Sequence, residues 1–234
     1  MRCLAIITAR GASKRIPRKN IRPFLGKPII AYSITAALEA KIFDEVMVST
    51  DDKEIAAISE KLGANIPFIR SKKASDDYAT TNDVIKEVLE SYLSIGKSFD
   101  YACCLYPTAP FVTGEILKVA FQILKTGKSD LVLPITPFSF PVQRSFIKKE
   151  DGEINYSQPD FINSRSQDLE KHFHDVGQFY FFKVVDYLHR GALISENMHG
   201  IEIDELHAQD IDNESDWNLA ELKYKHIDSS KKGK

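Results

Sequence analysis

Short apolar runs alternate along this chain with longer segments in which apolar residues recur every three or four positions. The runs are rich in β-branched and aromatic residues, as strands are, whereas the longer segments have the period of an amphipathic helix. Strands that alternate with helices are typical of a parallel sheet joined by crossover helices. The pattern therefore predicts an α/β protein with a doubly wound, mostly parallel, Rossmann-like sheet.

Seven runs and six periodic segments can be assigned. The predicted strands cover residues 3–9, 45–50, 66–69, 101–106, 130–136, 177–184 and 199–204. The predicted helices cover residues 27–43, 51–64, 80–96, 114–127, 184–191 and 214–227. Pro28 is expected in the first turn of the first helix, where its missing N–H costs no hydrogen bond.

The alternation lapses between residues 137 and 175, where Pro, Ser, Asn, Gln and charged residues dominate. We interpret this stretch as a small insertion, β-rich or irregular, with a hairpin at 148–156. Its phenylalanines stand among turn residues and need a surface to bury against; they are Phe138, Phe140, Phe146 and Phe161. Residues 1–228 are expected to form a single domain that carries this insertion, and the polar tail at 229–234 is expected to be disordered.

Composition narrows the classes of function. Charges nearly cancel to a net −2, and basic residues do not interleave with aromatic ones, so we expect no nucleic-acid partner. No apolar stretch approaches the roughly 20 residues of a membrane span, so we expect no membrane partner. The three cysteines lack metal-ligand spacing and are expected to be buried thiols of a cytoplasmic protein.

The most unusual segment follows the first predicted strand directly. It reads ARGASKRIPRKNI, residues 9–21, and contains five basic residues and no acidic one. In an open α/β sheet this position is the edge where ligands bind. The small residues Gly11, Ala12 and Ser13 allow close approach of backbone N–H groups to an anion, while Arg10 and Lys14 offer fixed positive charge. The spacing matches neither a P-loop nor a dinucleotide fingerprint, and a solvated basic loop remains the alternative.

A second constellation stands near the end of the chain. In an extended segment Asp210 and Asp212 point the same way, because strand side chains alternate. Magnesium takes one or two carboxylates together with waters and phosphate oxygens, so this pair is a candidate Mg²⁺ site facing the basic loop. The alternative is that the segment only caps the last helix.

Taken together, these motifs resemble those of the CMP-nonulosonate synthetases, the cytidylyltransferases that activate sialic acid and its bacterial relatives. The resemblance rests on ARGASKRIPRKNIRPFLGKPIIAYSI, STDDKEIAAI, PTAPF and DIDNESDW, which occur in the family's order over nearly the whole chain. The stretches FSFPVQRS and RSQDLEKHFHDVGQFYFF resemble the pseudaminic acid branch more than the sialic acid or Kdo branches. Tyr106 stands where sialic acid synthetases commonly carry Gln, which argues against a sialic acid acceptor.

The resemblance implies a nucleotidyltransferase fold and a reaction in which CTP and a nine-carbon 2-keto sugar acid give a CMP-sugar and pyrophosphate. By matching positions, Arg10, Lys14, Lys19 and Asp212 are the candidate catalytic residues, and Asp210 with Asp212 would carry Mg²⁺. The candidate nucleotide-binding residues are Ala9, Gly11, Ala12, Ser13, Asn20, Arg70 and Thr80. Thr80 is an equally good helix cap.

The acceptor carries a carboxylate, for which a guanidinium is the natural partner, so Arg144 and Arg165 are expected to bind it. The further candidates for acceptor contacts are Gln143, Gln167, His174, Asp175, Gln178 and Tyr180. The resemblance also implies a homodimer in which the insertion completes the acceptor site of a partner subunit.

Three alternatives stay open. Within the family, the acceptor could be legionaminic or sialic acid. A non-catalytic nucleotide- or RNA-binding protein would use the basic loop alone, and a homologue that had lost turnover would have no need of Asp210 and Asp212.

Overall fold

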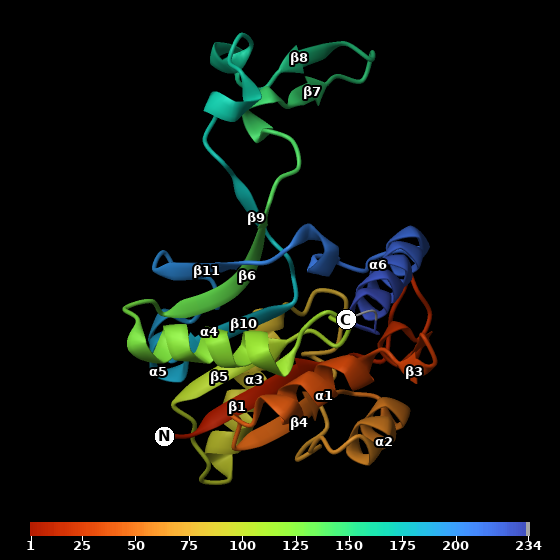
Figure 1. Cartoon of the computed structure of the whole chain (residues 1–234). Coiled ribbons are helices and arrows are strands. Elements are labelled where there is room, and N and C mark those ends of the chain that lie inside the picture. Colours follow the sequence, from red (N-terminus) through yellow and green to blue (C-terminus); the bar gives the residue numbers. More distant parts are fainter. Residues whose placement is uncertain (233–234) are drawn as a thin grey trace.

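One mixed sheet of seven strands forms the centre of the protein, with helices on both faces (Figure 1). The computed structural model describes the backbone of residues 1–232 and the side chains of residues 1–230. Six strands are hydrogen-bonded in the order β11-β6-β10-β5-β1-β4, and β9 pairs with β6. They are β1 (Cys3–Thr8), β4 (Glu45–Ser49), β5 (Tyr101–Leu105), β6 (Leu131–Pro137), β9 (Phe173–Asp175), β10 (Phe179–Lys183) and β11 (Met198–Glu202). Within this sheet β9 and β10 run antiparallel to their neighbours, so the predicted doubly wound, mostly parallel sheet is confirmed.

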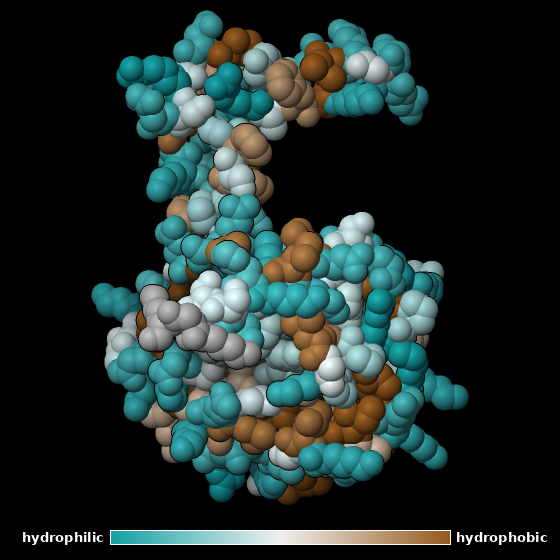
Figure 2. Space-filling view, turned by 45° about the vertical axis from the view of Figure 1, so that its right-hand side comes forward, coloured by the Kyte–Doolittle hydropathy of each residue, from teal (hydrophilic) through white to brown (hydrophobic). Residues whose placement is uncertain are grey.

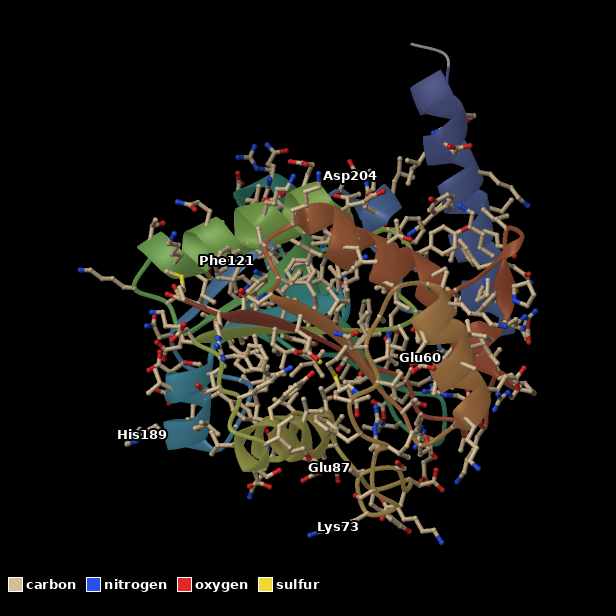
Figure 3. All side chains as sticks on the ribbon, turned by 90° about the horizontal axis from the view of Figure 1, so that it is seen from below. Glu60, Lys73, Glu87, Phe121, His189 and Asp204 are labelled. Atoms are coloured by element: carbon tan, nitrogen blue, oxygen red, sulfur yellow. The ribbon has the colours of Figure 1, made fainter. Side chains whose placement is uncertain are left out.

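Alternate residues of the strands contribute to two separate apolar layers, one on each face of the sheet. In β1, Ala5 and Ile7 face one layer and Leu4 and Ile6 face the other, and all four are fully buried. Helices α1 (Ile30–Ala40) and α4 (Gly114–Thr126) cover the first face, while α3 (Thr81–Ser94) and α5 (Val184–Arg190) cover the second. Figure 3 shows the two layers on opposite sides of the sheet. Strands buried on both faces explain why the sequence shows continuous apolar runs rather than alternation.

Two predicted elements at the edges are wrong. Residues 27–43 do not form one helix: β2 (Pro23–Phe24) and β3 (Lys27–Pro28) make a small hairpin, and α1 begins at Ile30. Pro28 therefore lies in a strand and not in a first helical turn. The chain turns at Leu25 and Gly26, whose φ values of 47° and 88° belong to the left-handed region.

The strand predicted at 66–69 is also absent. The chain runs beside β4 here, but the isolated bridge joins Met47 to Asn65, one residue before the segment. Pro67 has no N–H to donate, which interrupts a ladder that the backbone N–H of Arg70 resumes at Thr50.

Two further α-helices are α2 (Lys53–Lys61), which follows β4, and α6 (Glu214–Lys232), near the carboxyl end of the chain. The tail predicted to be disordered is helical as far as Lys232, so that prediction is wrong for residues 229–232; residues 233–234 lie outside the described part. Short 3-10 turns occur at Lys19–Ile21, Val142–Arg144, Pro159–Phe161, Ser166–Asp168 and Glu205–His207.

A third apolar cluster joins α6 to the hairpin. Phe24 is fully buried, and its ring lies 5.6 Å from that of Trp217 and 5.4 Å from that of Tyr32 in edge-on contacts. Ile16 and Ile211 pack in the same cluster. The basic loop and the Asp210–Asp212 segment are thus fixed to one another through a shared core.

The segment between β6 and β9 leaves the body as an arm, defined here as residues 138–172 (Figure 1). The predicted hairpin is present as β7 (Phe146–Lys148) and β8 (Ile154–Tyr156) at its outer end. Both ends of the arm are anchored by the pairing of β6 with β9.

No helix within the described residues is both long enough and apolar enough to span a membrane.

Candidate active site

A cavity of about 720 Å³ opens where β1 and β5 end. This volume lies within the range usual for small-molecule sites. It is bounded by the basic loop, the loop and helix start at 70–84, residues 106–108 after β5, and the Asp210–Asp212 segment. The predicted residues that line it are Arg10, Ala12, Ser13, Lys14, Lys19, Asn20, Arg70, Thr80, Asp210 and Asp212.

The basic loop keeps its shape through contacts with its own backbone and with β4. The side-chain amide of Asn20 donates to the Arg10 carbonyl at 2.8 Å, which closes the loop across its base. The backbone N–H of Gly11 donates to the carboxylate of Asp51 at 2.8 Å. A Cβ on Gly11 would lie 2.9 Å from Asp52, so only glycine fits there.

Two residues predicted to bind the nucleotide, Ala9 and Gly11, instead hold the basic loop in place. The backbone N–H of Ala9 donates to the Ser49 carbonyl at 2.9 Å, and the side chain is fully buried. Gly11 has its N–H bonded to Asp51. Neither Ala9 nor Gly11 lines the cavity, because the close turn of the chain engages their amides before a ligand can.

The six cations from Arg10 to Arg22 divide into two groups. Four of them line the cavity: Arg10, Lys14, Arg15 and Lys19. Arg18 instead forms a two-pronged ion pair with Asp52, at 2.5 and 3.0 Å, and lowers the pKa of that carboxyl to about 2. Arg22 pairs with Glu214 at 2.6 Å and covers the Trp217 ring at 4.5 Å. Arg18 and Arg22 thus form the second group, which fixes the basic loop to α2 and α6 and does not line the cavity.

Lys19 connects the basic loop to the acidic segment. Its ammonium donates to the Ile211 carbonyl at 2.6 Å and lies 3.8 Å from Asp212. Burial lowers the pKa of this lysine, although the two nearby aspartates oppose the shift. Asp212 also pairs with Arg15 at 2.8 Å. Lys19 is therefore held at the junction of the two motifs that the sequence singled out.

Both aspartates of the acidic segment face the cavity, as the extended spacing predicts. Burial raises the pKa of Asp210, and the neighbouring charge of Asp212 raises it further. Two oxygen donors with mutual repulsion fit a hard divalent cation such as Mg²⁺, which needs only one or two protein carboxylates. Among the side chains of residues 1–230, no group of three or more His, Cys, Asp or Glu is arranged to hold a metal.

The opposite wall carries Arg70, Thr80, Thr81 and Tyr106. The Arg70 guanidinium donates to the hydroxyl and carbonyl of Ser49, and burial lowers its pKa to about 10. Thr80 caps α3 in a reciprocal capping box with Asp83. Its side chain is thus occupied by the helix end, the alternative that the sequence left open, although the residue borders the cavity.

The predicted acceptor residues fall into two places. Asp175, Gln178 and Tyr180 lie where the arm rejoins the sheet. The Tyr180 hydroxyl donates to Asp175, and the Tyr180 ring lies 5.7 Å from the ring of Tyr106, which lines the cavity. The Gln178 amide donates to the His207 carbonyl at 2.6 Å. This group lies beside the cavity, behind Tyr106.

The other five predicted residues are not brought to this cavity. Gln143, Arg144, Arg165 and Gln167 are part of the arm, and none of them lines the cavity of its own subunit. Gln143 donates to the Glu170 carbonyl at 2.9 Å, and Arg165 pairs with Asp168 at 2.7 Å. His174 is exposed, and its ring centroid lies 4.9 Å from that of Phe138 in a tilted arrangement. The arm carries its four residues away from the body of their own subunit, so their predicted role as acceptor contacts stays a prediction that involves a partner subunit.

Sequence reasoning missed several lining residues. Thr108 and Asp77 border the cavity, and Arg15 was set aside as a lesser candidate. The place of Arg15 directly beside Lys14 in the basic loop was the available signal. Asp77 gave no signal, because an acidic residue in a polar loop has no pattern that marks it as part of a site.

The family model described as cytidylyltransferase matches residues 4–216. The chain is 41% identical over 225 residues to a pseudaminic acid cytidylyltransferase of Campylobacter jejuni, which covers 96% of this chain and 97% of the relative. It is 34% identical to a CMP-N,N'-diacetyllegionaminic acid synthase of Legionella pneumophila, over 94% of this chain and 95% of that one.

A solved structure supports the fold. A CMP:2-keto-3-deoxy-manno-octonic acid synthetase complexed with CTP superposes with a TM-score of 0.68, over 98% of this chain and 100% of that one, at 16% identity. The chain belongs to the cytidylyltransferase family of nucleotidyltransferases. The resemblance read from the motifs and the α/β fold class are thereby confirmed.

Proposed function

We propose that this enzyme joins CTP to pseudaminic acid, giving CMP-pseudaminic acid and pyrophosphate. The observation that carries the proposal is the cavity in which four cations face two carboxylates. It is supported by 41% identity, over nearly the whole chain, to a relative named for this activity. The anomeric hydroxyl of the sugar attacks the α-phosphorus, a new O–P bond forms, the bond to the β-phosphate oxygen breaks, and the hydroxyl proton is released.

The residues of the site serve this reaction by positioning and by charge. Arg10, Lys14 and Arg15 would bind the triphosphate and neutralise the charge that builds on the leaving pyrophosphate. Lys19, held beside Asp212, would lie near the α-phosphate. Ser13 and Ala12 leave room for the phosphates to approach the loop backbone.

The donor set of Asp210 and Asp212 fits Mg²⁺, and we propose that these two residues hold it. A bound Mg²⁺ would supply charge neutralisation on the phosphate oxygens. Before any ligand is present, Arg15 and Lys19 partly neutralise Asp212 and keep it facing the cavity.

The acceptor is proposed to be pseudaminic acid rather than another nonulosonic acid. The relative named for legionaminic acid, at 34% identity, makes that sugar the second candidate. The arm carries Arg144 and Arg165 away from its own cavity, and its exposed apolar side chains include Phe140, with 84% of its surface accessible. These facts support a homodimer in which the arm of one subunit supplies acceptor contacts to the other.

The site of action is proposed to be the cytoplasm. The buried cysteines Cys3, Cys103 and Cys104 are free thiols, which suits a reducing compartment. Burial raises the pKa of Cys104 to about 12, so this thiol is held protonated, as a buried structural cysteine is.

The proposal is tested by measuring pyrophosphate release from CTP and Mg²⁺ with pseudaminic, legionaminic, N-acetylneuraminic and Kdo acids in parallel. We expect turnover with pseudaminic acid and loss of about a hundredfold or more in kcat/KM for Asp212→Asn. Glu60→Gln removes the same charge from an exposed position on α2 and should leave turnover unchanged (Figure 3). A preference for legionaminic acid would show that the acceptor assignment is wrong. If none of the four sugar acids releases pyrophosphate, the proposed cytidylyltransferase activity itself is wrong.

A further inference from the structure

An acidic side chain already pairs with two of the cations proposed to bind the triphosphate. The carboxylate of Asp77 lies 2.5 Å from the Lys14 ammonium and 3.5 Å from an Arg10 guanidinium nitrogen. Arg10 also donates to the backbone carbonyl of Asp76 at 3.2 Å. Asp77 borders the same cavity as these cations, so an anion that binds them there meets its charge.

The loop that carries Asp77 is fixed at both ends. At one end the guanidinium of Arg70 is bonded to Ser49, and at the other the capping box joins Thr80 to Asp83. Between them, the Asp76 carboxylate accepts backbone N–H bonds from Tyr78 and Ala79 at 2.9 and 2.8 Å. This internal turn occupies the carboxylate of Asp76 and leaves that of Asp77 facing the basic loop.

Asp77 is ionised under ordinary conditions. Its hydrogen bond to Lys14 lowers the pKa of the carboxyl group, and the charge of Arg10 lowers it further. About 45% of its side-chain surface and 75% of that of Lys14 are accessible to solvent, so both groups are free to exchange partners.

We propose that Asp77 is an internal counter-ion that competes with the triphosphate for Arg10 and Lys14, and so sets how tightly the site holds CTP and pyrophosphate. The inference rests on the proposed function, because it takes the phosphates of CTP to be the ligand of these cations. Binding requires that the two cations give up Asp77, and the departure of pyrophosphate allows Asp77 to take them back. Asp77 thus weakens the complex with the substrate and speeds release of the product.

The size of the effect follows from the exposure of the pair. Exposed ion pairs contribute little, so removing the competitor should tighten binding by about two- to fivefold, which corresponds to about 0.4 to 1 kcal/mol. Because screening weakens exposed charges, the gain should shrink as salt is raised. A carboxylate that only orients the two cations would have the opposite effect, since its removal would weaken CTP binding.

The test is calorimetric titration of CTP, and separately of pyrophosphate, each with Mg²⁺ and without sugar acid. Asp77→Asn should bind both ligands about two- to fivefold more tightly than the natural protein in 50 mM salt, with a smaller gain in 500 mM salt. Asp77→Glu keeps a carboxylate and should bind both ligands close to the natural affinity. Glu60→Gln, which changes the net charge equally at a remote place, should not alter either affinity.

Unchanged or weaker binding by a folded Asp77→Asn protein would overturn the inference, as would equal tightening by Glu60→Gln. A natural protein that binds no CTP would overturn the proposed function instead. The pyrophosphate titration would then still report on Asp77, so the two failures are distinguishable.

Discussion

The charge on Asp210 reduces the stability of the folded protein. Burial and the neighbouring Asp212 raise its pKa, so the folded state binds this proton more tightly than the unfolded chain does. A raised folded pKa means that the group contributes stability below its unfolded pKa and loses that contribution as pH rises through the folded pKa. At neutral pH the site is thus less stable than it would be with a neutral side chain, as is common where function needs charge.

The variant Asp210→Asn tests whether the charge of Asp210 lowers the stability of the folded protein. At pH 7 and without metal we expect Tm to rise by about 1 to 3 °C, because the amide is neutral and nearly the same size. The gain should fade as the pH is lowered through the raised pKa of Asp210, because the natural side chain then takes up its proton and becomes neutral too. Turnover with Mg²⁺ should fall at least about a hundredfold. Calorimetric scans between pH 4 and 8 provide the measurement, and a lower Tm at pH 7 would contradict the argument.

At the scale of elements, the central strands and their helices could be predicted because they bury both faces. The apolar period of α3 and the run in β5 are each specified by several residues at once. The edge elements could not be predicted in this way. At 66–69 the composition favoured a strand, but one proline interrupts the ladder, and at 27–28 pairing in a hairpin replaces the start of the predicted helix.

The residues of the cavity likewise divide into those that the sequence could predict and those that it could not. The four charged residues Arg10, Lys14, Asp210 and Asp212 could be placed at one cavity from the sequence. The basic loop directly follows a predicted strand, and the two aspartates alternate in an extended segment, with dense charge of one sign in each motif. Which loop amides face a ligand could not be predicted, since Gly11 donates to Asp51, a residue 40 positions away. Contacts of that kind depend on how two strands are placed together.

The turn between β9 and β10 joins the foot of the arm to the cavity. Asp175 accepts the Tyr180 hydroxyl and also the backbone N–H of Gly177 at 2.8 Å. A Cβ on Gly177 would lie 3.8 Å from the Asp210 carboxyl group, so this turn passes close to the proposed metal ligand. Tyr180 is therefore a positioning residue for both the turn and the ring of Tyr106.

Tyr180→Phe should preserve the ring contact and remove only the hydroxyl. We expect a loss of about 1 kcal/mol in the free energy of unfolding, because Asp175 loses a hydrogen bond. The KM for the sugar acid should rise about tenfold, while the dissociation constant for CTP should change less than twofold. Tyr101→Phe, at the other end of β5, is the matched control. Equal changes in the two ligand constants would show that Tyr180 acts only on stability.

At the scale of the whole molecule, the arm is the feature that a single subunit does not explain. Figure 2 shows it standing away from the body with an open notch beneath its tip. Its apolar side chains remain accessible, with exposed fractions of 52% for Phe146, 61% for Ile147 and 54% for Ile154. Such a surface is typical of an interface, and the sequence showed it only as phenylalanines among turn residues. The direction in which an irregular segment leaves a sheet is not specified by any local pattern.

Charged substitutions on the arm test whether two copies meet there. We expect the natural protein to sediment as a dimer, and Phe140→Asp with Ile147→Asp to sediment as a monomer, because burying two carboxylates in an apolar contact is unfavourable. The monomer should bind CTP within about twofold of the natural protein, since the arm does not line its own cavity. Its turnover should fall about a hundredfold, because Arg144 and Arg165 no longer reach the acceptor of a partner.

Leu188→Asp, on the exposed face of α5, should leave both assembly and turnover unchanged. A natural protein that sediments as a fully active monomer would exclude the shared site, and a monomeric variant with full turnover would separate assembly from acceptor binding.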